Sequence, residues 1–177
     1  MLDTTERQER IRLLFQYYAD ELYSYVQCLA PREIDPKDIV QDTFVRAFLN
    51  LHRLRDETLA RAWLYRITRN LLFDELRRRR IEVTCFQRLP KQAMVHTPDT
   101  SLEIYDAIRS LPLHYQHVLY LRFVQDFALQ EIASILHKTP VSVRVTLHRA
   151  RNALTLELEF TIQSPYQSSA SKGDVKQ

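Results

Sequence analysis

The stretch WLYRITRNLLFDELRRRR, from Trp63 to Arg80, carries the strongest signal in this chain for both fold and function. At about 100° per residue, a helix over this stretch gathers basic and polar side chains into one stripe and leaves apolar side chains opposite. Guanidinium groups bind phosphate and guanine edges, asparagine can pair with adenine, and phenylalanine offers a ring on which an unpaired base stacks. The pattern predicts a helix that packs through one side and binds nucleic acid through the other. The predicted nucleic-acid residues are Arg66, Arg69, Asn70, Phe73, Arg77, Arg78 and Arg80.

A solvated charged face would give a similar pattern, so a second basic surface is needed to decide. It occurs in LQEIASILHKTPVSVRVTLHRARNAL, from Leu129 to Leu154, which predicts a helix, a turn and a second helix that begins at Thr139-Pro140. No acid stands between Glu131 and Glu157, so duplex DNA would meet only neutral or positive groups there. In the major groove an arginine can read guanine or hold phosphate, and a valine can contact a thymine methyl. The predicted contacts are Ser142, Arg144, Val145, Thr146, His148 and Arg149.

Two further amphipathic patterns precede the arginine helix. Apolar residues recur at helical spacing from Ile11 to Leu29, where the Ala30-Pro31 step ends the pattern. Asp35-Pro36 then reads as an N-cap followed by proline at the first helical position. The helix that follows has a buried stripe including Phe44, and its other face is expected to be exposed. That exposed face carries Asp38, Gln41, Asp42, Val45 and Arg46.

Composition excludes several classes of protein. The chain has 177 residues, enough for one ordinary domain or two small helical ones. Its single glycine, Gly173, excludes a Gly-rich phosphate-binding loop of the P-loop or dinucleotide-binding kind. Cys28 and Cys85 lack a Cys-x-x-Cys motif and histidines at ligand spacing, so we expect ordinary thiols, no metal and no cofactor. The polar start MLDTTERQER and the absence of a long apolar run favour the cytoplasm.

These patterns predict an all-α fold of two small helical domains joined by a linker. The first domain spans residues 1–80, and the second, with the helix-turn-helix, spans residues 101–160. Residues 81–100 contain two prolines and keep no period, which indicates a linker. Residues 161–177 are polar and low in complexity, so we expect a disordered tail. Within the second domain, Val118, Leu119, Leu121 and Phe123 belong to one apolar helix before a turn at Gln125-Asp126.

In this order the motifs resemble those of bacterial RNA polymerase sigma factors of the compact, two-domain extracytoplasmic-function (ECF) type. The resemblance runs from about Leu14 to Leu158. DIVQDTFVRAF looks like the helix that binds core polymerase, and AWLYRITRNLLFDELRRRR looks like the helix that binds the minus-ten element. SLPLHYQHVLYLRF, LQEIASIL and LHRAR look like the domain that reads the minus-thirty-five element. The resemblance implies a specificity subunit without catalytic activity, whose partners are core RNA polymerase, promoter DNA and an anti-sigma factor.

The resemblance also implies roles for the residues above. The exposed face from Asp38 to Arg46 would bind the polymerase, the arginine stripe would bind the opening minus-ten DNA, and the loop from Leu54 to Thr58 would hold a flipped base. Two positions depart from the family pattern. His137 stands where glycine is common in the turn, so we expect the turn to differ locally, at an energetic cost if the residue is left-handed. Val145-Thr146 replace a frequent Ser-Arg pair, so promoter preference is expected to be unusual.

Two other classes of function stay open. A stand-alone helix-turn-helix regulator would explain residues 129–154 but would leave the arginine helix and the acidic face without a role. A helical hydrolase or nuclease would need carboxylates such as Asp74, Glu75 and Asp106. Adjacent acids on a helix diverge, however, and salt bridges within the helix are the expected role of Asp74 and Glu75.

Overall fold

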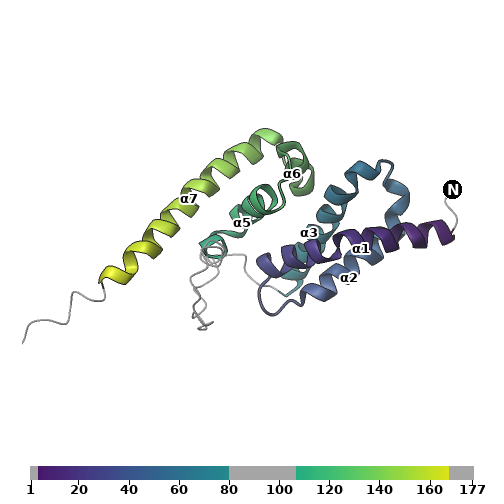
Figure 1. Ribbon diagram of the computed structural model, residues 1–177, viewed down its shortest axis with the longest axis horizontal. Helices are drawn as coiled ribbons and strands as arrows, with labels where there is room; N and C mark the ends of the chain where they lie inside the picture. The colour runs from purple at the N-terminus through teal and green to yellow at the C-terminus, as the bar shows by residue number, and fades with distance from the viewer. Residues whose placement is uncertain (1–3, 80–106, 168–177) are drawn as a thin grey trace, which may run out of the picture.

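The computed structural model describes residues 4–79 and 107–167, and every regular element among them is helical (Figure 1). The N-terminal block contains α1 (Thr4–Leu29), α2 (Pro36–Asn50), the short 3-10 turns η1 (Leu51–Arg53) and η2 (Glu57–Leu59), and α3 (Ala60–Arg78). The C-terminal block contains a helical end at residues 107–110, α5 (Leu113–Leu119), the π-helical turn η3 (Tyr120–Val124), α6 (Leu129–Leu136) and α7 (Pro140–Gln167). The predicted linker at residues 81–100 lies outside the described residues.

The helix ends follow the local signals in the sequence. Helix α1 ends at Leu29, two residues before Pro31. Helix α2 begins at Pro36, and the Asp35 carboxylate accepts a 2.9 Å hydrogen bond from the backbone N–H of Lys37. Helix α7 begins at Pro140, where the Thr139 hydroxyl oxygen accepts a bond from the N–H of Ser142. These caps satisfy backbone donors that have no partner within the helix, which confirms the predicted starts.

Helices α1, α2 and α3 pack into a three-helix unit that holds the first basic surface in place. Leu22 of α1, Ala47 of α2 and Leu64 of α3 are fully buried. The buried hydroxyls of Thr43 and Thr68 lie 3.1 Å apart, and each also lies within hydrogen-bonding distance of the carbonyl four residues earlier. Two small threonines at this crossing bring α2 and α3 close together without leaving a hydroxyl unpaired.

The turn of the helix-turn-helix places its histidine in a left-handed conformation. His137 adopts φ 52° and ψ 46°, a left-handed conformation in which glycine carries no steric penalty but histidine does. The next N–H, of Lys138, donates to the carbonyl of Ala133 and closes the end of α6. Asp126 also has a positive φ, 53°, which confirms the turn predicted at Gln125-Asp126.

Two features of the C-terminal block differ from expectation. The helix from α5 widens into the π-turn η3, so Tyr120 is buried while Phe123 is 58% exposed. Helix α7 continues through Gln167, so residues 161–167 of the predicted tail are helical. No helix within the described ranges is both long and apolar enough to cross a membrane.

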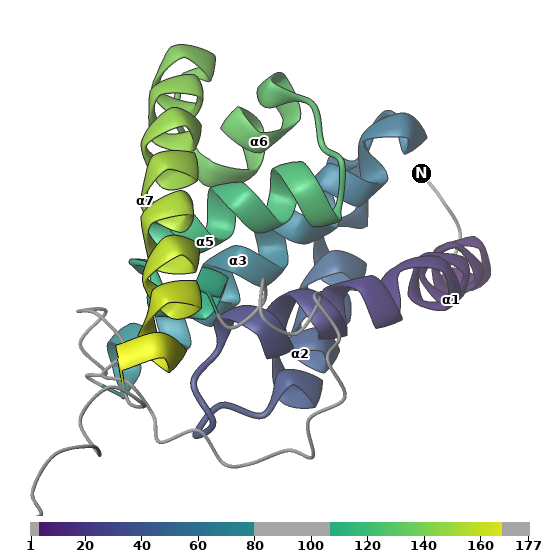
Figure 2. The same ribbon diagram turned by 60° about the vertical axis from the view of Figure 1, so that its left-hand side comes forward.

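The two blocks lie against one another. Helices α5 and α6 lie beside α3 in both ribbon views (Figures 1 and 2), and α6 packs directly on α3. The buried residues of both blocks form one continuous apolar cluster, from Leu14 in α1 to Ala150 in α7. The predicted all-α fold is confirmed, and the two helical units share a core through this contact.

Candidate polymerase and nucleic-acid interfaces

The predicted polymerase-binding residues share the exposed face of α2. All five are exposed, and the opposite side of α2 is buried through residues such as Phe44 and Ala47. The five residues are Asp38, Gln41, Asp42, Val45 and Arg46. Val45 is 53% exposed, as single apolar residues on a protein surface commonly are.

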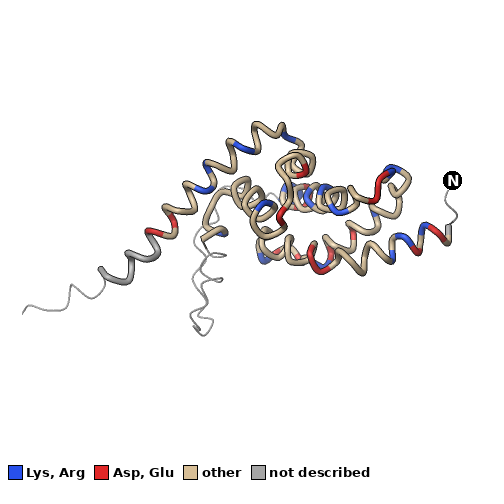
Figure 3. The backbone as a smooth tube through the Cα atoms, turned by 45° about the horizontal axis from the view of Figure 1, so that its top comes forward, with Lys and Arg blue, Asp and Glu red and all other residues tan. Residues whose placement is uncertain are grey.

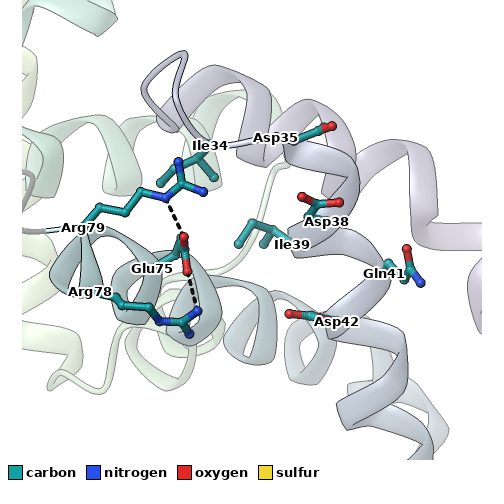
Figure 4. Close-up of a pocket in the computed structure, with 9 residues that line it drawn as sticks. All are labelled: Ile34, Asp35, Asp38, Ile39, Gln41, Asp42, Glu75, Arg78 and Arg79. Atoms are coloured by element: carbon teal, nitrogen blue, oxygen red, sulfur yellow. Dashed lines mark hydrogen bonds and ion pairs between the residues drawn. The ribbon is translucent and has the colours of Figure 1, made fainter.

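The acidic end of this face lines a pocket together with the basic end of α3 (Figure 4). In the pocket, Glu75 pairs with Arg78 at 3.1 Å and with Arg79 at 2.6 Å, and a hydrogen bond from Arg79 holds the pKa of Glu75 below its ordinary value. Arg77 similarly lies 3.8 Å from Asp74. The expected salt-bridge role of the two acids is thereby confirmed.

These exposed ion pairs leave the basic end of α3 available to a phosphate backbone. The Arg77 and Arg78 side chains remain 79% and 74% exposed, and exposed pairs of this kind are weak. Arg80 lies outside the described residues. So does Asp106, the third carboxylate considered for an enzyme. Among the residues described, no group of histidines, cysteines and acids could hold a metal ion.

The middle of α3 is not the open stripe that periodicity predicts. Arg66, Arg69, Asn70 and Phe73 are all intermediate in exposure, and Phe73 contacts the C-terminal block through His117. The Arg69 guanidinium lies 4.5 Å from the ring centroid of Phe73, and that ring stacks on His117 of α5 at 5.1 Å. Burial lowers the pKa of Arg69, and its Nε has no hydrogen-bond partner among the described residues. Helical spacing identified the face correctly, but it gave no sign that another helix covers it.

The loop between α2 and α3 is held in a defined conformation. The Asp56 carboxylate accepts bonds from the N–H and the hydroxyl of Thr58, and these bonds lower the pKa of Asp56. From α1, Arg10 donates to the carbonyl of Leu54 at 3.2 Å and pairs with Glu57. The ends of the predicted base-holding loop are therefore fixed to α1.

The second basic surface lies on the first half of α7, which carries the basic residues of that helix, while its acids stand farther along (Figure 3). Val143 and Ala150 are fully buried, as predicted, and turn the opposite side outward. Thr146 is partly buried and its hydroxyl donates to the carbonyl of Ser142, so that hydroxyl is already engaged. The exposed predicted residues are Ser142, Arg144, Val145, His148 and Arg149.

The contacts that join the two blocks were not foreseen from the sequence. Tyr25 Oη of α1 lies 2.7 Å from Nδ1 of His117. Arg61 of α3 pairs with Glu21 and donates to the backbone carbonyl and the side-chain oxygen of Gln125 at 3.0 and 2.6 Å. Such contacts join residues far apart in the chain, so a pattern within one helix carries no signal for them.

Comparison with known proteins connects these surfaces to a family. The family descriptions Sigma-70 region 2 and Sigma-70, region 4 match residues 14–81 and 101–154, in that order. The ECF RNA polymerase sigma factor SigW of Bacillus subtilis is 27% identical over 169 residues, covering 85% of this chain and 90% of SigW. SigM of the same bacterium is 26% identical over 148 residues, covering 80% of this chain and 90% of SigM.

Solved structures show the same fold. The sigma factor RpoE, in its co-crystal structure with the anti-sigma factor NepR from Bartonella quintana, gives a TM-score of 0.71 at 19% identity, covering 85% of this chain and 98% of RpoE. CnrH, in complex with the cytosolic domain of CnrY, gives a TM-score of 0.63 at 24% identity, covering 86% of this chain and 89% of CnrH. With region 2 and region 4 matched in order over most of its length, the chain belongs to the sigma-70 family of RNA polymerase sigma factors, in its extracytoplasmic-function group.

Proposed function

We propose that this sigma factor binds core RNA polymerase through the exposed face of α2, and promoter DNA through α3 and α7. Sigma factors are specificity subunits of RNA polymerase without catalytic activity, and they direct the enzyme to promoters. One observation supports the division of roles most directly. The acidic face of α2 lies beside the basic end of α3, and the basic first half of α7 forms a separate surface of the same molecule. One chain can therefore hold the polymerase and two DNA elements at once.

Strand opening follows from differential binding. The first half of α7 fits duplex DNA in the major groove, where Arg144 and Arg149 reach base edges or phosphates. The face of α3 carries groups suited to unpaired bases, with Phe73 for stacking and Asn70 for base edges. Open DNA gains contacts to this face that closed DNA cannot make, so binding shifts the equilibrium toward the melted form.

An anti-sigma factor is the further partner that we infer. RpoE, which shares the fold, was crystallised with the anti-sigma factor NepR. The exposed face of α2 and the acid-free face of α7 are surfaces that such a partner would need to cover to prevent transcription. Because the partner polymerase and the chromosome are cytoplasmic, we also place this chain in the cytoplasm.

In vitro transcription tests the proposal. Genomic fragments are transcribed by core RNA polymerase from a related bacterium, with and without this protein. We expect start sites that appear only with the protein and share two spaced upstream elements. A variant with Asp38→Arg and Asp42→Arg should lose these start sites. If no start site depends on the protein and it neither joins nor competes for core polymerase, a stand-alone DNA-binding regulator becomes the better assignment.

A further inference from the structure

The first turns of α1 reach across to the loop that joins α2 to α3 (Figure 1). Arg7 donates to the carbonyl of Phe48 at 3.1 Å, and its guanidinium lies 5.1 Å from the ring centroid of the same residue. Arg10 donates to the carbonyl of Leu54 at 3.2 Å and pairs with the carboxylate of Glu57. Both arginines precede residue 14, where the match to Sigma-70 region 2 begins. These contacts therefore belong to a part of the chain that the family match does not cover.

Arg10 bridges the stretch of this loop that has no regular structure. The turn η1 ends at Arg53 and η2 begins at Glu57, and the three residues between them form no helical turn. The Leu54 carbonyl stands at one end of this stretch and the Glu57 carboxylate at the other, and Arg10 binds both. One guanidinium thus fixes the two ends of the irregular stretch relative to each other and to α1.

The exposed chemistry of the loop suits a DNA strand. Its acids are already engaged, because Asp56 accepts two bonds from Thr58 and Glu57 pairs with Arg10. Guanidinium groups bind phosphate, and an imidazole ring can stack on a base. Side chains of these kinds are exposed at three positions of the loop, His52, Arg53 and Arg55. A strand passing here would meet cationic groups on a backbone that is held in place.

We propose that Arg10 is a positioning residue for the capture of unpaired minus-ten DNA, because it holds the loop in the conformation that presents Arg53 and Arg55 to the strand. This inference rests on the proposed function, which assigns the opened minus-ten DNA to the N-terminal block. A loop that is already ordered loses less conformational freedom when a ligand binds, so binding is tighter. The α7 surface belongs to the other block, so the effect of Arg10 is confined to unpaired DNA.

Four variants test this role. Arg10→Met removes the guanidinium but keeps an unbranched stem, and Arg10→Lys keeps the charge without the planar fork. Arg12→Met is the matched control, because Arg12 is an exposed arginine of the same helix that pairs with Glu9 at 2.6 Å. It removes the same charge without touching the loop. Arg10→Met combined with Glu57→Gln removes the acid that Arg10 neutralises but does not restore the bridge.

Two measurements are made on each variant. Hydrogen exchange of the full chain, read by mass spectrometry over residues 51–59, reports how firmly the loop is held. Fluorescence anisotropy reports binding of the holoenzyme, formed with core RNA polymerase, to two DNA probes. One probe is a single strand with the upstream element nearer the start site, taken from the transcription experiment, and the other is a duplex with the more distant element.

We expect Arg10→Met to speed exchange in the loop and to weaken single-strand binding roughly three- to tenfold more than Arg12→Met does. Duplex binding should match that of the control. Arg10→Lys should recover part of both losses, and the double variant should bind the single strand as weakly as Arg10→Met. Glu57→Gln alone breaks the bridge from its exposed side, so the exchange comparison does not depend on the folding of Arg10→Met.

Three outcomes would overturn the inference. The first is loop exchange in Arg10→Met that equals that of wild type. The second is faster exchange with single-strand affinity no lower than in Arg12→Met, which would make Arg10 a purely structural residue. The third is wild-type affinity in the double variant, because Arg10 would then act by neutralising Glu57 and not by positioning the loop. A failure of the proposed function is distinct, since the wild-type protein itself would then give no start sites.

Discussion

Acidification should separate the two domains, because His117 is held neutral while they are in contact. Burial, followed by the positive charge of Arg69 and the neighbouring His114, lowers the pKa of His117 from 6.5 to about 3. Tyr25, whose Oη shares the hydrogen bond at Nδ1, is uncharged, because burial raises its own pKa. A proton added to His117 would therefore face a cation from α3 and find no carboxylate in contact with it among the described groups.

The sign and size of the effect follow from these two pKa values. While the two blocks are in contact, the pKa of His117 lies below its ordinary value. The stability that neutral His117 contributes to this contact is therefore complete above about pH 6.5 and is lost as the pH falls toward 3. When the two blocks are apart, His117 has its ordinary pKa near 6.5. From pH 7.5 to pH 5.5, the ratio of molecules with the blocks in contact to molecules with them apart then falls roughly tenfold. That change corresponds to about 1.4 kcal/mol.

Small-angle X-ray scattering of the full chain at the two pH values measures the separation as an increase in radius of gyration. His117→Asn is the matched variant, since its side-chain oxygen can accept a bond from Tyr25 and does not titrate. His114→Asn removes an exposed imidazole one turn earlier on α5. We expect wild type and His114→Asn to expand on acidification and His117→Asn to respond little. Equal expansion in wild type and His117→Asn would refute the reasoning.

The remaining predictions concern the separate surfaces. Asp38→Arg combined with Asp42→Arg should abolish binding to core polymerase in a pull-down without changing the circular dichroism spectrum, because both residues are exposed; retained binding would exclude α2 as the docking face. Arg144→Ala should weaken promoter binding by about 1–3 kcal/mol if it reads a base, or mainly reduce the salt dependence if it holds phosphate, and anisotropy titrations at several salt concentrations distinguish the two. An unchanged affinity and salt slope would place Arg144 off the DNA. His137→Gly should raise the free energy of unfolding in urea by about 1 kcal/mol, because the residue has φ 52°; a decrease would show that the left-handed turn is not what costs energy there.

The helices and their faces were predictable because the signals are local. Asp35-Pro36 and Thr139-Pro140 mark helix starts through the chemistry of a few adjacent residues, and helical spacing separates inner from outer positions. The same locality explains the left-handed His137, since a short turn between two amphipathic helices leaves few conformations. The exposed face of α2 was therefore identified residue by residue, and so was that of α7 apart from the partly buried Thr146.

The contact between the domains was not predictable in this way. Spacing places Arg69 and Phe73 on one face of α3, but it cannot say which element covers that face. The π-turn removes the remaining regularity, because its wider turn buries Tyr120 and exposes Phe123, the reverse of what α-helical spacing predicts for an apolar residue. A long-range pair such as Tyr25 with His117 depends both on which element covers α3 and on how the π-turn redirects the side chains.

The chemistry that suits α3 for unpaired bases also explains why its own C-terminal domain binds there. Flat rings and guanidinium groups stack on imidazole and phenol as readily as on nucleobases. Four ring pairs join the two blocks: Tyr25 with His117, Tyr25 with Tyr120, Tyr65 with Phe127, and Phe73 with His117. Such pairs contribute about 0.5–1.5 kcal/mol each beyond burial, while each buried polar atom without a partner costs about 1–3 kcal/mol. Three such atoms lie in the interface, so their cost offsets part of what burial and the ring pairs contribute. The side chains of α3 that suit unpaired bases are therefore the same ones that hold the two blocks together.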